Sequence, residues 1–209
     1  MHIPSAETKD IEVLSFEDAK QNSGREDYDR EKWIYIPDFY SEYRYILGTR
    51  GHRPLICIGI NPSTAEPDNL DNTLKSVERI AHYNDYDSFI MFNVYAQRAT
   101  DPDHMERELN RRMHEENMKA FEYVLSISEE QPSVWAAWGT IIEKRAYLPE
   151  CVLDMIHLGE KYGAKWFTAG ARSRKAGHPH HPLYLKKDSV LDPFDAEDYI
   201  TTLKEKMMK

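Results

Sequence analysis

The stretch Leu55-Ile56-Cys57-Ile58-Gly59-Ile60-Asn61-Pro62-Ser63-Thr64-Ala65 decides the fold. It opens with four uninterrupted apolar residues, which is typical of a strand buried on both faces of a parallel sheet. Pro62 lacks an N–H and biases Asn61 toward an extended conformation, so the chain leaves the sheet sharply there. The Asn61 amide can then project into a crevice and hold a water or the polar edge of a ligand. The alternative is an ordinary Asn-Pro turn in which Ser63 or Thr64 caps the next helix.

Three more apolar runs predict buried strands further along the chain. They are Phe89-Ile90-Met91-Phe92, Val134-Trp135-Ala136-Ala137-Trp138 and Ala164-Lys165-Trp166-Phe167-Thr168. Segments with helical spacing separate or follow these runs, over 74–81, 109–125, 141–158 with a break near Pro149, and 195–208. Buried strands that alternate with helices are typical of a parallel sheet covered on both faces. The sequence therefore predicts a three-layer α/β/α domain with a central, mainly parallel four-stranded sheet.

Two shorter runs precede this core, Trp33-Ile34-Tyr35-Ile36 and Tyr43-Arg44-Tyr45-Ile46-Leu47. Each is ended by a proline or a glycine, so they predict an antiparallel addition to the main sheet. The residues before them are polar and show little periodicity. We therefore expect 1–32 to form a loosely packed extension and 33–209 to form a single domain.

Composition limits the class of protein. The chain has 209 residues and a formal charge of −9, which argues mildly against a general nucleic-acid binder. It contains no apolar run of about 18 residues, so we expect no membrane span. Its two cysteines fit no metal-binding spacing. These features predict a cytoplasmic protein with reduced thiols.

Polar residues follow the predicted strands, where ligands of parallel sheets bind. Asn93 ends the second buried strand and can pair with a base edge, or it can only satisfy the backbone of its loop. Arg98 can meet a phosphate or pair with an acidic neighbour. Asp71 can activate a water or cap the helix that follows it. Trp138 ends the third buried strand at the same predicted edge.

The segment Gly177-His178-Pro179-His180-His181-Pro182-Leu183-Tyr184 brings three imidazoles into one proline-stiffened loop. Zinc binding is one interpretation, but the loop has no companion pair of cysteines. An imidazole that stabilises charge on a leaving group is the better hypothesis. The alternative is a surface loop with incidental histidines.

A basic stretch surrounds this loop. From Lys161 to Lys187 the chain has no Asp or Glu. Such a stretch on an acidic protein can create a local field for phosphates, or it can be an ordinary solvated surface. The basic residues within it are Lys161, Lys165, Arg172, Arg174, Lys175, Lys186 and Lys187.

These motifs, taken in order, resemble a bacterial and phage family known as domain of unknown function 1643. The resemblance covers the chain from Tyr43 to Tyr184. The matching positions are Tyr43-Arg44-Tyr45, Asn61-Pro62-Ser63-Thr64-Ala65, Asp71, Thr73, Asn93, Arg98-Ala99-Thr100, Trp138-Gly139 and His181-Pro182-Leu183-Tyr184. That family has no settled activity, so the resemblance implies a fold more than a function.

A more distant resemblance is to the uracil-DNA glycosylase superfamily. Gly59-Ile60-Asn61-Pro62 is similar to its water-holding loop, and Asn93 looks like the residue that reads the flipped base. Trp138-Gly139 is similar to a pair that follows the third strand. The segment His178-Pro179-His180-His181-Pro182-Leu183 resembles a loop that supports the departing base, with one extra residue. That extra residue leaves His178, His180 and His181 all open as the base-facing histidine.

The resemblance implies a nucleobase or nucleic-acid pocket that can support hydrolysis of an N-glycosidic bond in a modified or mismatched base. Asn61, or alternatively Asp71, would hold the water, and a loop histidine would stabilise the leaving base. The implied mechanism needs neither a metal nor an organic cofactor. The residues implied in substrate binding are Asn93, Ser63, Thr64, Arg98, Trp138, Arg172, Arg174 and Lys175. The alternatives are a non-catalytic nucleotide or nucleic-acid binder and an enzyme acting on free modified nucleotides.

Overall fold

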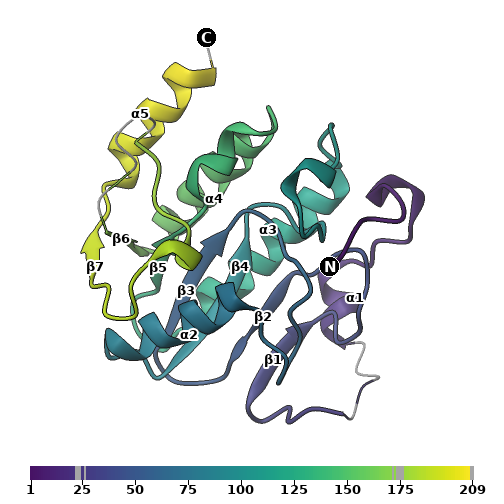
Figure 1. Cartoon of the computed structure of the whole chain (residues 1–209), viewed down its shortest axis with the longest axis horizontal. Helices are drawn as coiled ribbons and strands as arrows, with labels where there is room; N and C mark the ends of the chain where they lie inside the picture. Colours follow the sequence, from purple (N-terminus) through teal and green to yellow (C-terminus); the bar gives the residue numbers. More distant parts are fainter. Residues whose placement is uncertain (22–24, 26, 171, 173–176, 208–209) are drawn as a thin grey trace.

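A computed structural model describes residues 1–21, 25, 27–170, 172 and 177–207 (Figure 1). Within these residues the strands form one seven-stranded sheet in the order β1-β2-β4-β3-β5-β6-β7. The strands are β1 (Trp33–Ile36), β2 (Ile46–Thr49), β3 (Pro54–Gly59), β4 (Ser88–Asn93), β5 (Ser133–Ala136), β6 (Lys165–Ala169) and β7 (Leu191–Pro193).

The centre of the sheet is parallel, as the four apolar runs predict. β3 pairs in parallel with both β4 and β5, and β5 pairs in parallel with β6. The prediction of a four-stranded sheet is wrong in number, because antiparallel strands extend both sides. β1 and β2 add beside β4, as expected, and β7 adds beside β6. β7 has three residues and none of them is buried, so the sequence contains no apolar run that would predict it.

The strand expected over 43–47 begins later than predicted. β2 starts only at Ile46, while Tyr43 forms an isolated bridge with Gln97 and the Arg44 amide donates to the Ala96 carbonyl at 2.9 Å. Tyr43 and Arg44 therefore pair with the segment that follows β4. This pairing brings the Arg44 side chain into the interior beside the end of β4.

Helices cover both faces of the sheet. The α-helices are α1 (Phe16–Gln21), α2 (Asn72–Tyr83), α3 (Arg111–Ser126), α4 (Leu148–Lys161) and α5 (Ala196–Met207). Short 3-10 turns connect them: η1 (Thr8–Asp10), η2 (Pro102–His104), η3 (Gly139–Glu143) and η4 (Pro182–Tyr184). α2 packs on the face formed by Leu55 and Cys57, whereas α1, α3, α4 and α5 pack on the face of Ile56 and Ile58. Alternate residues of β3 thus serve two separate cores, which explains its continuous apolar run.

The first residues of α2 and α4 are explained by the residues that stand at those positions. Asp71 caps α2 by accepting from the Leu74 amide at 2.9 Å, as its position suggests. The helix expected over 141–158 begins only at Leu148, with η3 before it. Pro149 lies in the first turn of α4, where its missing N–H has no intrahelical partner to lose.

The described part of the N-terminal segment packs more closely than its polarity suggests. Val13, Phe16 and Ala19 are buried in the main core, and Phe16 and Ala19 lie three residues apart on one face of α1. Glu116 accepts from the Phe16 amide at 2.7 Å and fixes the start of α1. The expectation of a loosely packed arm therefore does not hold for these residues.

The two cysteines, Cys57 and Cys151, are free and buried. Burial raises the pKa of the Cys151 thiol to about 12 and that of Cys57 well above its ordinary value. None of the helices in the described part of the chain has both the length and the apolar composition required to span a bilayer.

Candidate functional site

The carboxyl ends of β3 and β4 lie side by side and carry most of the candidate residues. The parallel register pairs Gly59 with Asn93, so the two strands end at the same level. Beyond that point the Ala99 amide donates to the Pro62 carbonyl at 2.9 Å, which ties the loop after β3 to the loop after β4. Asn61 and Asn93 therefore stand at one edge of the sheet.

Asn61 is half-buried, and its side chain braces the two loops. Its Nδ2 donates to the Ala99 carbonyl at 2.7 Å and to the Pro62 carbonyl at 3.1 Å. No described residue donates to its Oδ1. The amide nitrogen is thus committed to the backbone, and any role toward a water rests with the carbonyl oxygen, an acceptor.

Asn93 is almost fully buried and its amide is held in one orientation. Its Oδ1 accepts from Arg44 Nη2 at 3.4 Å, while its buried Nδ2 has no acceptor among the described residues. A Cβ at Gly59 would lie 3.1 Å from this Nδ2, so glycine leaves space around it. An unpaired buried donor is costly, which makes Nδ2 a natural contact for a ligand acceptor.

Two buried arginines grip the loop that follows β3. Arg44 is 1% exposed and Arg98 is 0% exposed. Arg44 Nη1 donates to the Ala65 carbonyl at 3.1 Å, and Arg98 Nη1 donates to the Ser63 carbonyl and, at 3.4 Å, to the same Ala65 carbonyl. Arg98 also donates to Tyr35 Oη at 2.9 Å. The loop is therefore held by its backbone, through charge-assisted bonds.

Neither guanidinium forms an ion pair with a carboxylate of the described residues. Burial, reinforced by the charge of Arg98, lowers the pKa of Arg44 to about 9, and Asp71 partly opposes this shift. Arg44 is still protonated at neutral pH. Two like charges buried together without a carboxylate are unfavourable by themselves, so they favour an anion or a developing negative charge nearby.

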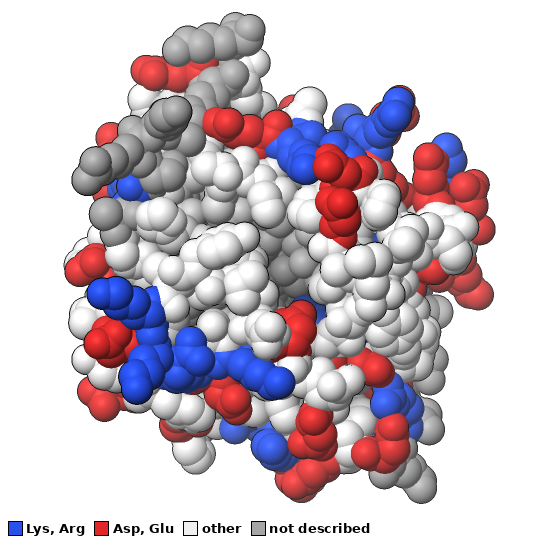
Figure 2. Space-filling view, viewed as in Figure 1, with Lys and Arg blue, Asp and Glu red and all other residues white. Residues whose placement is uncertain are grey.

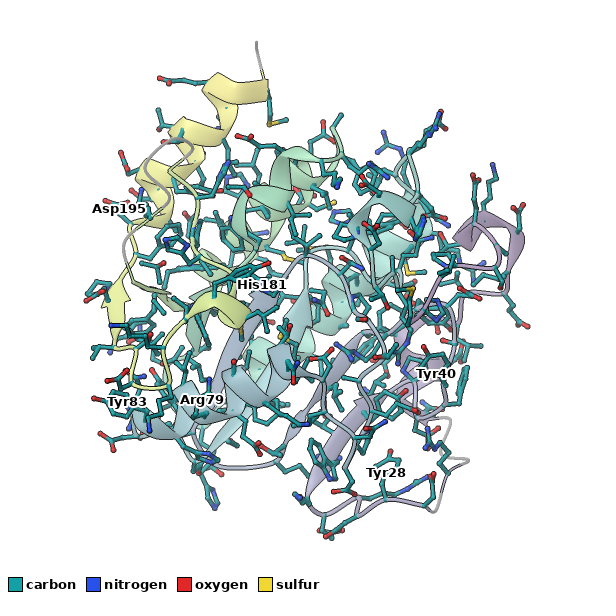
Figure 3. All side chains as sticks on the ribbon, in the orientation of Figure 1. Tyr28, Tyr40, Arg79, Tyr83, His181 and Asp195 are labelled. Carbon is teal, nitrogen blue, oxygen red and sulfur yellow. The ribbon has the colours of Figure 1, made fainter. Side chains whose placement is uncertain are left out.

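His181 stands beside the same edge, near the middle of the face in Figure 3. Burial lowers its pKa, and the charge of Asp71 opposes the shift. Its Nδ1 accepts from the Leu183 amide at 3.3 Å, which assigns the proton of the neutral ring to Nε2. His181 is thus a neutral donor close to a carboxylate, and Figure 2 shows the face hollowed near its middle.

The other two histidines of the loop have different surroundings. His178 is fully buried, with Nδ1 2.6 Å from Tyr199 Oη and Nε2 2.9 Å from Glu143 Oε1. Trp138 is also fully buried and donates to the same Tyr199 Oη at 2.8 Å. Both residues join α5 to the core. His180 is half-buried and lies about 4.0 Å from a Cβ added at Gly170.

The remaining candidates are dispersed. Ser63 Oγ is 3.0 Å from Thr100 Oγ1, and Thr64 is half-buried in the same turn. Arg172 pairs with Asp198 at 3.6 Å, beside α5. Arg174 and Lys175 lie outside the described residues. The basic stretch is also divided, since Lys161 ends α4 and Lys165 begins β6, at the amino edge of the sheet.

Arg44 is the residue that sequence reasoning missed as a site residue. The signal was a cation inside a run expected to be a strand, next to two tyrosines. Hydrogen bonds and charge interactions link Arg44 to Asn93, Arg98 and Asp71, and Asp71 to His181. Asn61 lies at the same edge through its bond to the Ala99 carbonyl, and we call the whole group the strand-end cluster. Its members are Arg44, Asn61, Asp71, Asn93, Arg98 and His181.

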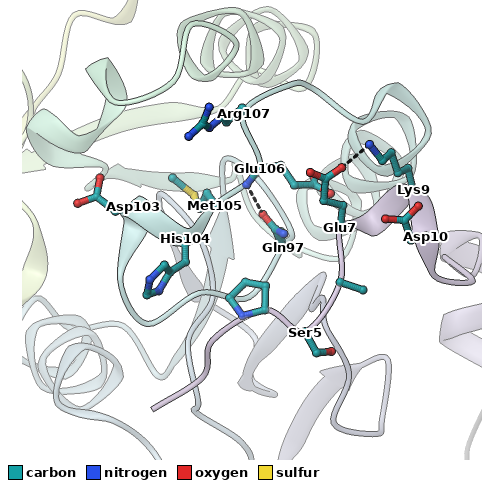
Figure 4. Close-up of a pocket in the computed structure, with 12 residues that line it drawn as sticks. Ser5, Glu7, Lys9, Asp10, Gln97, Asp103, His104, Met105, Glu106 and Arg107 are labelled. Atoms are coloured by element: carbon teal, nitrogen blue, oxygen red, sulfur yellow. Dashed lines mark hydrogen bonds and ion pairs between the residues drawn. The ribbon is translucent and has the colours of Figure 1, made fainter.

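A cavity of about 590 Å³ lies elsewhere, between the N-terminal segment and residues 103–107 (Figure 4). Its lining includes Glu7, Asp10, Asp103 and Glu106. The Glu106 carboxylate accepts from Thr8 Oγ1 at 2.7 Å and secures that segment. These four carboxylates outnumber the two cations of the lining, Lys9 and Arg107, so the cavity has a net negative charge that disfavours an anion. No group of His, Cys, Asp and Glu in the described residues is arranged to hold a metal ion.

Fold and site together define an α/β protein with a polar, positively charged cluster at the carboxyl edge of its parallel strands. Residues 44–183 match the family described as "Protein of unknown function (DUF1643)", and the chain belongs to that family. No curated protein and no solved structure matches the chain.

Proposed function

We propose that the strand-end cluster binds a nucleotide unit and supports hydrolysis of the N-glycosidic bond to its base, as in a uracil-DNA-glycosylase-like pocket. The observation that carries this proposal is the buried pair Arg44 and Arg98, which has no carboxylate partner among the described residues and lies beside Asn93 Nδ2, which has no acceptor among them. Fixed positive charge in a water-poor site stabilises negative charge that develops during a reaction. A base that departs with the electrons of its glycosidic bond is such a charge.

The cluster supplies a group for each requirement of this reaction. Asn93 Nδ2 can donate to an acceptor on the base, and His181 Nε2–H can donate to the departing base. Asp71 Oδ1 already caps α2, so its second carboxylate oxygen can take a proton from water that Asn61 Oδ1 orients. The water oxygen bonds to the anomeric carbon, the C–N bond breaks, and the base leaves with the electron pair and is then protonated.

A second candidate function is nucleotide binding without hydrolysis. The observation that favours it is the local commitment of both candidate water residues: Asn61 braces two loops and Asp71 caps a helix. Binding would then use Asn93 and the arginine pair in the same place. The two functions differ only in whether the base is released.

The test is incubation of the full chain with oligonucleotides and free nucleotides carrying normal and modified bases, with mass spectrometry of released bases. Asp71→Asn keeps a capping side chain while removing the carboxylate, and we expect it to lower base release by roughly 10² to 10⁴-fold. His181→Gln should lower release by about 10² to 10³-fold. His180→Gln is the matched control in the same loop and should leave release unchanged.

Release that persists in both variants would contradict the assigned roles. Binding of a nucleotide with no release from any substrate would favour the non-catalytic function.

A further inference from the structure

α2 presents an exposed row of basic and aromatic side chains. Lys75, Arg79 and Tyr83 are spaced four residues apart and all three are exposed, Tyr83 to 53%. Residues at this spacing share one helix face, with about 6 Å of rise between successive members. Figure 3 places Arg79 and Tyr83 on the same face of the molecule as His181.

The segment after η4 lies along this helix. Asn84, which ends α2, donates to the Ser189 carbonyl at 3.0 Å and accepts from the Leu191 amide at 3.0 Å. Between η4 and this anchor the chain exposes Lys186 and Lys187. Figure 2 shows basic side chains gathered on this part of the face, at the lower left.

Tyr184 connects the basic surface to the candidate site. Its side chain is 81% exposed, and its ring centroid lies 6.0 Å from that of His181. We call Lys75, Arg79, Tyr184, Lys186 and Lys187 the α2 strip. It begins beside the strand-end cluster and runs along α2.

The charge of the strip is available to an external partner. None of its four cations lies within ion-pair distance of a carboxylate of the described residues. Two acidic residues, Glu78 and Asp188, are interspersed, which leaves the strip net positive. On a chain with a formal charge of −9, a local positive surface beside a candidate site is suited to a polyanion.

We propose that the α2 strip binds single-stranded nucleic acid and leads it to the strand-end cluster. This inference rests on the proposed function and names its substrate as a polynucleotide. Lysine and arginine bind successive phosphates, and an exposed tyrosine ring stacks on an unpaired base. A free nucleotide would need only the cluster and would not use cations displaced along a helix. Stacking also favours a single strand over a duplex, whose bases are already stacked on one another.

The strip can be tested by fluorescence anisotropy. The probes are labelled 15-nucleotide single strands of DNA and of RNA, and a matched duplex. If all four cations contact phosphates, the logarithm of the binding constant should fall with the logarithm of salt concentration with a slope of roughly −3. The paired variants Lys75→Glu/Arg79→Glu and Lys186→Glu/Lys187→Glu should each weaken single-strand binding at least tenfold and reduce this slope. Tyr184→Ala should weaken binding by roughly 5- to 150-fold, and Tyr184→Phe should restore it.

The matched control is Lys161→Glu/Lys165→Glu, the same change of charge at the amino edge of the sheet. It should leave single-strand binding within about twofold at moderate salt. An equal loss in the control, stronger binding of the duplex, or no binding of any strand at low salt would each overturn the proposal.

Failure of the strip is distinguishable from failure of the cluster. Base release from free nucleotides, with no strand bound, would overturn the strip and leave the glycosidic function intact. Strand binding that depends on the strip, with no base released from any substrate, would support the strip and contradict the hydrolytic function.

Discussion

Replacing Arg44 with methionine should remove ligand binding with little change in the free energy of unfolding. The cost of burying the Arg44 charge and the gain from its hydrogen bonds nearly cancel. Burial of its charge, reinforced by the charge of Arg98, lowers its pKa from the ordinary arginine value to about 9. At 1.36 kcal/mol per tenfold change in proton affinity, this shift corresponds to an unfavourable contribution of roughly 4 to 5 kcal/mol. This cost is offset by two hydrogen bonds that Arg44 donates, to the Ala65 carbonyl and to Asn93 Oδ1. Hydrogen bonds to a charged group contribute about 1.5 to 3 kcal/mol each, or roughly 3 to 6 kcal/mol together.

The expected net change in the free energy of unfolding for Arg44→Met is therefore small, within about 2 kcal/mol. Urea unfolding measures it, in the presence and absence of the nucleotide that the wild-type chain binds best. The ligand should stabilise the wild type, by about 2.7 kcal/mol at 100 times its dissociation constant, and should no longer stabilise the variant. A loss above about 4 kcal/mol without ligand, or ligand stabilisation retained in the variant, would refute the reasoning.

Three further predictions concern single residues. Because burial lowers the pKa of His181, the neutral donor persists below its ordinary pKa of about 6.5, and base release should stay level as pH falls to that value. The stability that the neutral ring contributes is complete above that value and should be lost as pH falls from there through the lowered pKa. A pH–rate profile and unfolding at matched pH values measure both, and a loss of release already at pH 7.5 would contradict this. Phe16→Ala should cost about 3 to 5 kcal/mol in urea unfolding, since Phe16 is 1% exposed in the main core; a change below about 1 kcal/mol would mean that the N-terminal segment is not part of the cooperative unit. Glu106→Gln should destabilise the chain by about 1 to 3 kcal/mol and speed hydrogen exchange at the Thr8 amide, because Glu106 accepts from Thr8 and Tyr95; unchanged exchange there would show that the carboxylate does not hold the segment.

The parallel centre of the sheet could be predicted because burial on both faces requires a continuous run of apolar residues. Residues of β3 and β4 face one of two cores, so every position is apolar or small except Asn93 at the end of β4. β7 has no apolar run, since its residues are half-buried or exposed, and its pairing with β6 is a long-range contact. The N-terminal helix α1 was missed for a similar reason: its buried face rests on Phe16 and Ala19 alone.

The candidate site shows the same limit. Asn61 and Asn93 could be placed at one edge because parallel strands end at that edge. The importance of Arg44 depends on how deeply it is buried and on which carbonyls it meets, which a linear sequence does not contain. The basic stretch was misleading as a unit, since Lys165 begins a strand while Lys186 lies beyond the far end of the same strand. Basic residues of one stretch of sequence therefore lie at opposite ends of β6.

The grip of Arg44 and Arg98 on carbonyl oxygens has a consequence for how this protein can diversify. Every amino acid presents the same carbonyl, so the bonds to positions 63 and 65 do not depend on which side chains stand there. Substitutions at Ser63 and Thr64 can therefore change the chemistry offered to a ligand while the course of the loop is conserved. The anchor and the variable surface are encoded by different residues, which lets selection, or a designed library, alter ligand preference without rebuilding the scaffold.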